Sequence, residues 1–199
     1  MYRGDDILKI YDEDGNEIGR ETRETVHRQG LLHVVAHVWM FEENSEGLNI
    51  FFQKRSAGRE LYPGKYDLVQ TTHFDPDEGL VEGVLHAMDY YLGTKVDPEN
   101  AAHIGSLRQH IDQGDYHDNA LVQVFSVRIK KALFVLPDAE DIVKARFEDF
   151  ADFVHGRKDS IPMYSADGLY ISKSFPDDWW LRKEEFLEVV EPYIRGALS

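Results

Sequence analysis

The sequence predicts a single α+β domain built on a mixed sheet, and three observations support this. Apolar, β-branched runs of strand length dominate the middle of the 199-residue chain. Segments with helical periodicity separate them, without any internal repeat. A hydrophobic content of 42% provides for a sizeable core. We expect an N-terminal hairpin over residues 1–26, a core over 27–155 and a helical C-terminal extension over 156–199.

The first half of the chain contains the clearest strand patterns. Alternating residues on both sides of Asp14 and Gly15 predict a hairpin. The run LLHVVAHVWMF, residues 31–41, predicts a central strand, and LNIFFQKRS predicts its antiparallel neighbour. A short third strand is expected in GKYDLVQT. A helix is expected over residues 78–92, with Gly93 as its stop.

The second half adds strands and closes with a helix. Strands are expected over residues 102–109, 120–129 and 141–149, the last leading into a short helix at about 150–155. Residues 181–198 have one apolar face at helical spacing, which predicts an amphipathic closing helix. Pro192 marks the expected bend in that helix.

Composition and charge exclude several classes of function. A net charge of −15 disfavours a nucleic-acid backbone as partner, because phosphates would be repelled. The absence of cysteine excludes disulfides, thiol nucleophiles and thiolate metal sites. The apolar runs are too short to span a bilayer, and the first ten residues lack the pattern of a signal peptide. A cytoplasmic protein without a membrane partner is therefore expected.

Three stretches carry a resemblance to a known family. VHRQGLLHVVAHVWMF is a strand entered through two histidines, and FFQKRSAGRELYPGKYDLVQTTH contains the pattern Q-(K/R)-R-S…P-G-x-(W/Y)-D. THFDPDEGLVEGVLHAMDYYLGT has the spacing of a Nudix box. Together they resemble the Nudix superfamily, in particular its branch similar to isopentenyl-diphosphate isomerase. The resemblance implies an α/β/α sandwich around a mixed sheet and metal-dependent chemistry on diphosphates.

The box keeps its spacing but loses carboxylates. Glu78 and Gly93 stand at its first glutamate and last glycine, whereas Ala87, Tyr90 and Tyr91 stand where the family has the metal-binding glutamates. Alanine offers no ligand atom, and tyrosine, with a pKa near ~10, is a poor ligand for a hard cation. The helix is expected to keep its shape without its metal platform. Glu78 remains the candidate catalytic residue, and its alternative role is an acid beside the helix N-terminus.

A second set of residues resembles the metal site of the isomerase branch. His27, His33, His73 and Asp118 match its histidines and one of its acids in order and context. The resemblance implies a divalent metal, with Mn²⁺, Zn²⁺ and Mg²⁺ as candidates. The alternative is that these are strand-edge histidines bonded to backbone. Ala120 replaces the second acid and Thr71 replaces the catalytic cysteine of the branch, so isomerase activity is not expected.

Two other histidines receive structural roles. His37 lies ~13 Å along an extended strand from His33, too far to share a metal, and is expected to be packed or hydrogen-bonded in the sheet. His117 is expected in a surface loop. The adjacent Trp179 and Trp180 should point in opposite directions, so that at most one of them faces a ligand.

Gln53, Lys54 and Arg55 are the candidate ligand-binding residues. They end a strand in the most basic patch of an acidic chain, and arginine suits bidentate contact with phosphate. The alternative is a strand end with solvated charges. Three functions stay open: a binder of a diphosphate-containing small molecule with little hydrolysis, an active pyrophosphohydrolase with a His/Asp metal site, and a structural or homodimer-forming module.

Overall fold

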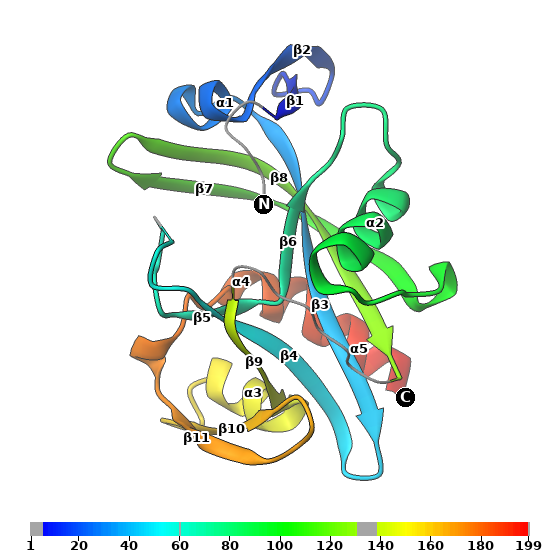
Figure 1. The fold of residues 1–199 in the computed structure, drawn as a ribbon, viewed down its shortest axis with the longest axis vertical. Helices are drawn as coiled ribbons and strands as arrows, with labels where there is room; N and C mark the ends of the chain where they lie inside the picture. Colours follow the sequence, from blue (N-terminus) through cyan, green and yellow to red (C-terminus); the bar gives the residue numbers. More distant parts are fainter. Residues whose placement is uncertain (1–5, 60, 131–138, 199) are drawn as a thin grey trace.

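The computed structural model describes residues 6–59, 61–130 and 139–198, with a nine-stranded mixed sheet at the centre (Figure 1). Its strands run in the order β11-β10-β9-β4-β3-β8-β7, with β5 beside β4 and β6 beside β3. The bounds are β3 (His33–Asn44), β4 (Gly47–Arg55), β5 (Tyr66–Leu68), β6 (Gln70–His73), β7 (Ala101–Gln113), β8 (Tyr116–Ile129), β9 (Ala139–Arg146), β10 (Ile161–Ser165) and β11 (Tyr170–Ser174).

The remaining elements lie before the sheet or on its faces. A separate hairpin is formed by β1 (Ile7–Tyr11) and β2 (Glu17–Thr22), as the sequence predicts. The helices are α1 (Arg23–Gln29), α2 (Leu80–Leu92), α3 (Phe147–Val154), α4 (Lys183–Glu185), the π-helical turn η3 (Phe186–Val190) and α5 (Glu191–Leu198), with short 3₁₀ turns η1 (Pro98–Asn100) and η2 (Pro176–Asp178). None of the helices within the described ranges is long and apolar enough to cross a membrane.

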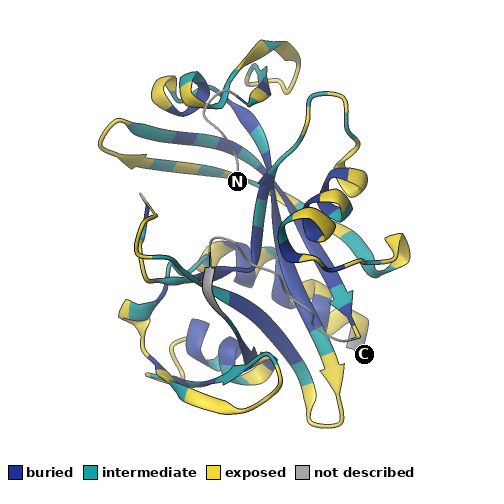
Figure 2. Ribbon diagram, viewed as in Figure 1, coloured by how far each residue is buried: buried dark blue, intermediate teal, exposed yellow. Residues whose placement is uncertain are grey.

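Two apolar layers confirm the α/β/α sandwich. Successive residues of β3 point to opposite faces of the sheet. On one face Val38 packs in the cluster that contains Met88 of α2. On the other, Trp39 packs against Phe150 of α3 and Phe186 of η3. Figure 2 shows the central strands buried along most of their length.

The sheet divides in a way that brings three strand ends together. β3 and β8 run parallel over ten residue pairs, from His33 beside Ala120 to Glu42 beside Ile129. β3 and β4 pair only through residues 41–44 and 47–50, near their hairpin, and then diverge (Figure 1). β5 and β6 fill the gap, pairing with β4 and β3 respectively. The starts of β3 and β8 and the end of β6 therefore meet at one end of the sheet.

The structure corrects the predicted entry into the central strand. Residues 23–29 form helix α1, so His27 lies on a helix and not at a strand edge. The Thr22 hydroxyl accepts a hydrogen bond from the Thr25 N–H at 3.2 Å, and Gly30 ends the helix with a φ of 62°. Seven residues are too few to show helical periodicity clearly, but the Thr22 cap is a recognisable start signal and Gly30 a recognisable stop signal.

The C-terminal extension and the long hairpin also differ from prediction. Residues 161–174 form the β10–β11 hairpin, which joins the main sheet through β9, so the extension is not purely helical. β7 and β8 form one long hairpin that turns at Gly114, and His117 therefore lies in a strand and not in a surface loop. The predicted closing helix is present, and its π-helical turn ends two residues before Pro192, which cannot donate a backbone hydrogen bond.

Candidate metal centre

Four of the predicted metal ligands meet where β3 and β8 begin. His27 comes from α1, His33 from β3, His73 from β6 and Asp118 from β8. The three imidazoles each place a nitrogen within 4.8 Å of the other two. Asp118 Oδ1 lies 3.4 Å from His33 Nε2 and 4.0 Å from His27 Nε2. Residues between positions 27 and 118 of the sequence thus form one cluster.

Backbone contacts orient two of the imidazoles toward this cluster. His27 Nδ1 lies 2.8 Å from the Arg23 carbonyl oxygen, and His33 Nδ1 lies 3.0 Å from that of Leu31. A carbonyl can only accept, so in both rings the proton is on Nδ1 and the lone pair is on Nε2. This is the arrangement of metal-binding histidines held by an outer hydrogen bond. These backbone contacts are also those expected in the alternative of backbone-bonded histidines.

The atoms that face the cluster are buried and unsatisfied. His27 Nε2, His33 Nε2 and Asp118 Oδ1 have no hydrogen-bond partner among the residues that the structure describes. Leaving such atoms unpaired costs free energy, and native proteins rarely do so without a reason. Their chemistry, imidazole nitrogen with carboxylate oxygen, fits Zn²⁺ or Mn²⁺. Mg²⁺ fits less well, because it prefers oxygen ligands.

Burial also keeps the imidazoles in the form that binds a metal. It lowers the pKa of His27 to about 4, with the charge of Arg23 acting in the same direction. Burial likewise lowers the pKa of His33 and takes that of His73 well below its ordinary value. All three rings are therefore neutral at pH 7, and a neutral imidazole has the lone pair that a metal ligand needs.

Helix α1 is positioned on the sheet by its C-terminal turn. The Gly30 carbonyl accepts a hydrogen bond from Asn119 Nδ2 at 3.0 Å, directly beside Asp118. The His27 ring stacks on Tyr116 at 4.7 Å between centroids. Arg23 lies one helical turn before His27, and its Nε is buried without a hydrogen bond to any described residue. Sequence reasoning missed Arg23 because the helix was not predicted.

Gln53 and Arg55, two of the three predicted ligand-binding residues on β4, contact residues 61–68 and not the four residues of the histidine cluster. Gln53 Nε2 donates to the Leu68 carbonyl at 2.7 Å. Arg55 donates to the Leu61 carbonyl and pairs with the buried Asp67, both at 2.9 Å. Lys54 lies between them on the strand. The structure therefore uses Gln53 and the Arg55 guanidinium for internal contacts and does not bring them into the histidine cluster.

The C-terminal segment contacts the same Asp67. Arg182 also pairs with Asp67, at 3.2 Å, and its guanidinium carbon lies 4.2 Å from the centroid of the Trp180 ring. Trp180 stacks on Tyr62, whereas Trp179 packs in the core against Phe52. The two tryptophans thus have different surroundings, as predicted. Arg182 was not among the predicted site residues, since no local motif marks it. Asp67 is the last residue of the P-G-x-(W/Y)-D pattern, but no role was predicted for it.

His37 has the structural role that the sequence predicts. Its Nδ1 lies 2.7 Å from Glu185 Oε2, and Trp39 Nε1 donates to the other oxygen of that carboxylate at 2.6 Å. All three side chains are buried. This contact fastens the C-terminal helical segment to β3.

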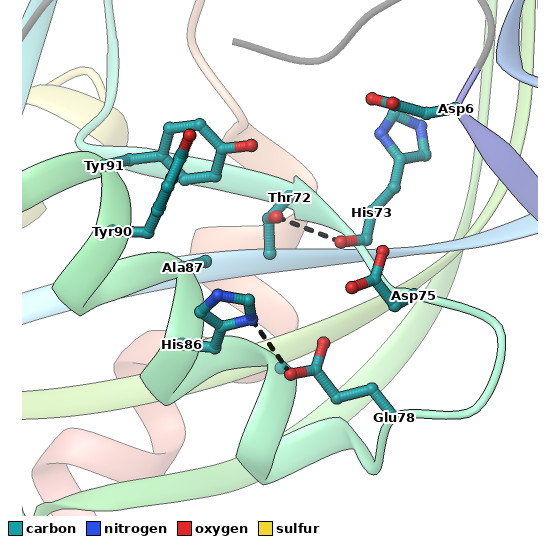
Figure 3. A pocket seen from close by; sticks show the side chains of 10 residues that line it. Asp6, Thr72, His73, Asp75, Glu78, His86, Ala87, Tyr90 and Tyr91 are labelled. Atoms are coloured by element: carbon teal, nitrogen blue, oxygen red, sulfur yellow. Dashed lines mark hydrogen bonds and ion pairs between the residues drawn. The ribbon is translucent and has the colours of Figure 1, made fainter.

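A polar cavity of about 340 Å³ lies beside α2 (Figure 3). His86 Nδ1 lies 3.1 Å from Glu78 Oε1, and polar atoms of Asp75, Glu78 and His86 lie within 4.8 Å of one another. Glu78 thus contacts a histidine as well as preceding the helix. The cavity is lined by Asp6, Thr72, His73, Asp75, Glu78, Gly83, His86, Ala87, Tyr90 and Tyr91. His73 therefore belongs both to this lining and to the histidine cluster.

Comparison with known proteins agrees with this architecture. No family model matches the sequence. An uncharacterized Nudix hydrolase of Clostridium acetobutylicum is 24% identical over 173 residues, covering 85% of this chain and 82% of the relative. An isopentenyl-diphosphate Delta-isomerase of Photobacterium profundum is 23% identical over 79% of this chain and 87% of its own.

Solved structures show the same fold. A Deinococcus radiodurans protein matches with a TM-score of 0.52 at 16% identity, over 75% of this chain and 89% of its own. A MutT/nudix family protein of Enterococcus faecalis matches with a TM-score of 0.53 at 12% identity, over 81% and 62%. The chain has the fold of Nudix proteins and is similar in sequence to Nudix hydrolases. The resemblance assigns α2 to the Nudix box, and Ala87, Tyr90 and Tyr91 of this helix line the cavity of Figure 3.

Proposed function

We propose that this Nudix-fold protein binds a diphosphate-containing small molecule through a divalent metal ion held by His27, His33, His73 and Asp118. The observation that carries the proposal is the convergence of His27 Nε2, His33 Nε2 and Asp118 Oδ1, buried and without hydrogen bonds to described residues. When bound, such an ion would supply positive charge to pyrophosphate oxygens. Zn²⁺ or Mn²⁺ suits the donor set best.

Arg23 supports an anionic ligand at the same place. Its charge lowers the pKa of His27, His33 and His73 alike, so its positive potential extends over the whole cluster. In a chain with a net charge of −15, a diphosphate would be repelled by most of the surface. A metal ion beside Arg23 would instead attract the diphosphate at this place. Arginine is also well suited to bind phosphate oxygens.

Little standard hydrolysis is proposed because the Nudix helix lacks its carboxylates. Ala87, Tyr90 and Tyr91 supply none, although all three line the cavity beside α2. A hard cation that activates water needs several oxygen ligands. The isomerase reaction is also not proposed, since Ala120 and Thr71 stand where the isomerase branch has its second glutamate and its cysteine.

A pyrophosphohydrolase is the second candidate, and one observation favours it. Asp75, Glu78 and His86 bring three potential ligand atoms within 4.8 Å of one another beside the altered box. His73 links this cavity to the histidine cluster. In this alternative Glu78 would act on the water that attacks the diphosphate.

Metal content and ligand protection test the proposal. Wild-type protein loaded with Zn²⁺ or Mn²⁺ and desalted should retain about one ion per chain by mass spectrometry, and His33→Ala should lose it. His110→Ala, which removes an exposed histidine of β7, is the matched control. A wild type that retains no metal would refute the proposal.

A panel of nucleoside and isoprenoid diphosphates should raise the melting temperature without turnover. Turnover abolished by Glu78→Gln would favour the hydrolase instead.

A further inference from the structure

We infer that Gln109 and Arg182 are positioning residues that hold Asp118 in the orientation required of a metal ligand. The inference rests on the proposed metal centre and adds two residues that no motif in the sequence marks. Through Arg182, the C-terminal segment becomes part of the centre although it contributes none of the four ligands.

We call the chain of contacts from Arg182 through Gln109 to Asp118 the relay. Its first contact fixes the Oδ2 atom of the Asp118 carboxylate. Gln109 Nε2 donates to Asp118 Oδ2 at 2.8 Å, while Oδ1 faces His33 and His27. Gln109 pairs with Ala120 across β7 and β8, so Asp118 is its diagonal neighbour on the same face. A carboxylate held by one oxygen presents the other to the cluster.

The second contact fixes the glutamine itself. Arg182 Nη1 donates to Gln109 Oε1 at 2.8 Å. Arginine has only donors and an ionised carboxylate has only acceptors, so the two neighbours determine which end of the amide faces which. A glutamine is suited to this place because it offers an acceptor on one side and a donor on the other. Turning the amide over would place its NH₂ against the guanidinium and its oxygen against the carboxylate.

Arg182 is in turn held rigidly. Its side chain is 7% exposed, and it contacts the fully buried carboxylate of Asp67 through Nε and Nη2, both at 3.2 Å. Its guanidinium also lies against the Trp180 ring. The chain on both sides is fixed, because the Trp180 N–H donates to the Tyr66 carbonyl and the Phe186 N–H donates to that of Arg182, both at 3.0 Å. The relay therefore ends on Arg182, a buried side chain that is paired with a buried carboxylate.

Metal affinity is the quantity that tests the relay. Competition titrations with Zn²⁺ and the visible spectrum of the Co²⁺-loaded protein would be measured for Gln109→Leu, Arg182→Met and the double variant. Gln109→Leu keeps the side-chain volume but removes both hydrogen bonds. It should raise Kd roughly 10- to 100-fold, the usual effect of removing an outer-shell partner. Gln113→Leu, the same change at an exposed position of the same strand, should leave Kd unchanged.

Comparing the metal Kd of the two single variants with that of the double variant distinguishes a positioning role from general destabilisation of the fold. Arg182→Met should weaken metal binding less than Gln109→Leu, and the double variant should match Gln109→Leu alone, because Arg182 acts through Gln109. Additive losses, or an unchanged Kd in Gln109→Leu, would overturn the inference. A variant that merely unfolds would be recognised by a loss of melting temperature without metal.

A wild type that binds no metal would refute the proposed function. The hydrogen bonds of the relay would then be tested by a second measurement that needs no metal. In metal-free protein, nitrogen-15 NMR of the Gln109 side-chain amide should show slow hydrogen exchange that becomes fast in Arg182→Met. Fast exchange in the wild type would overturn the relay on its own.

Discussion

Acidification should destabilise the metal-free protein through its buried histidines. Burial holds the pKa of His27 at about 4, against a reference value of 6.5. The unfolded chain therefore takes up a proton at a higher pH than the folded protein does. The stability that the neutral ring contributes is fully present above pH 6.5 and is lost as the pH falls toward 4.

These two pKa values set the size of the effect. His27 alone should lower the free energy of unfolding by about 2 kcal/mol between pH 7.5 and pH 5, and by about 3 kcal/mol in total. His33 and His73 change in the same direction and add to the loss. The lowered pKa of Glu185 and of Glu191 affects stability only below their ordinary values near 4.5, outside this range.

Urea unfolding of chelator-treated protein at half-unit steps from pH 5 to pH 7.5 measures the effect. In His27→Gln the fall in the free energy of unfolding over this range should be smaller than in the wild type by about 2 kcal/mol. His110→Gln, at an exposed position, should behave as the wild type does. Identical pH profiles for the wild type and His27→Gln would refute the assignment of His27 as a buried neutral histidine.

Three further predictions concern the core, the C-terminal segment and the Nudix helix. Phe150→Ala removes a ring that contacts the rings of Trp39, Trp179 and Phe186, and it should lower the free energy of unfolding by about 3–5 kcal/mol, measured by urea titration. Glu185→Ala leaves His37 without its buried partner and should cost about 3–5 kcal/mol, with an unchanged stability contradicting the role of this contact. Ala87→Glu combined with Tyr90→Glu should create Mg²⁺ binding on α2, detectable by calorimetry; no gain of binding would show that α2 lacks more than these carboxylates.

The sequence alone determined the sandwich, because its signals are local. The alternation of β3, the Asp14–Gly15 turn and the Gly93 stop of α2 each depend on a few neighbouring residues, and the structure contains all three elements. The identity of the cluster residues also came from the sequence, through the contexts of His27, His33 and His73. The short helix α1 escaped prediction because seven residues give too little periodicity, and the β10–β11 hairpin was missed altogether.

Only the tertiary structure decided how these residues meet. The parallel register of β3 and β8 sets His33 beside Ala120 and thereby brings Asp118 to the histidines, and no local pattern encodes that register. The same holds for Gln109 and Arg182, whose contact joins positions 73 residues apart. The candidate ligands on β3, β6 and β8 come together because these strands, distant in the sequence, pair in the sheet. A sequence can therefore name candidate ligands. Whether their nitrogen and oxygen atoms face one another is decided only by the folded chain.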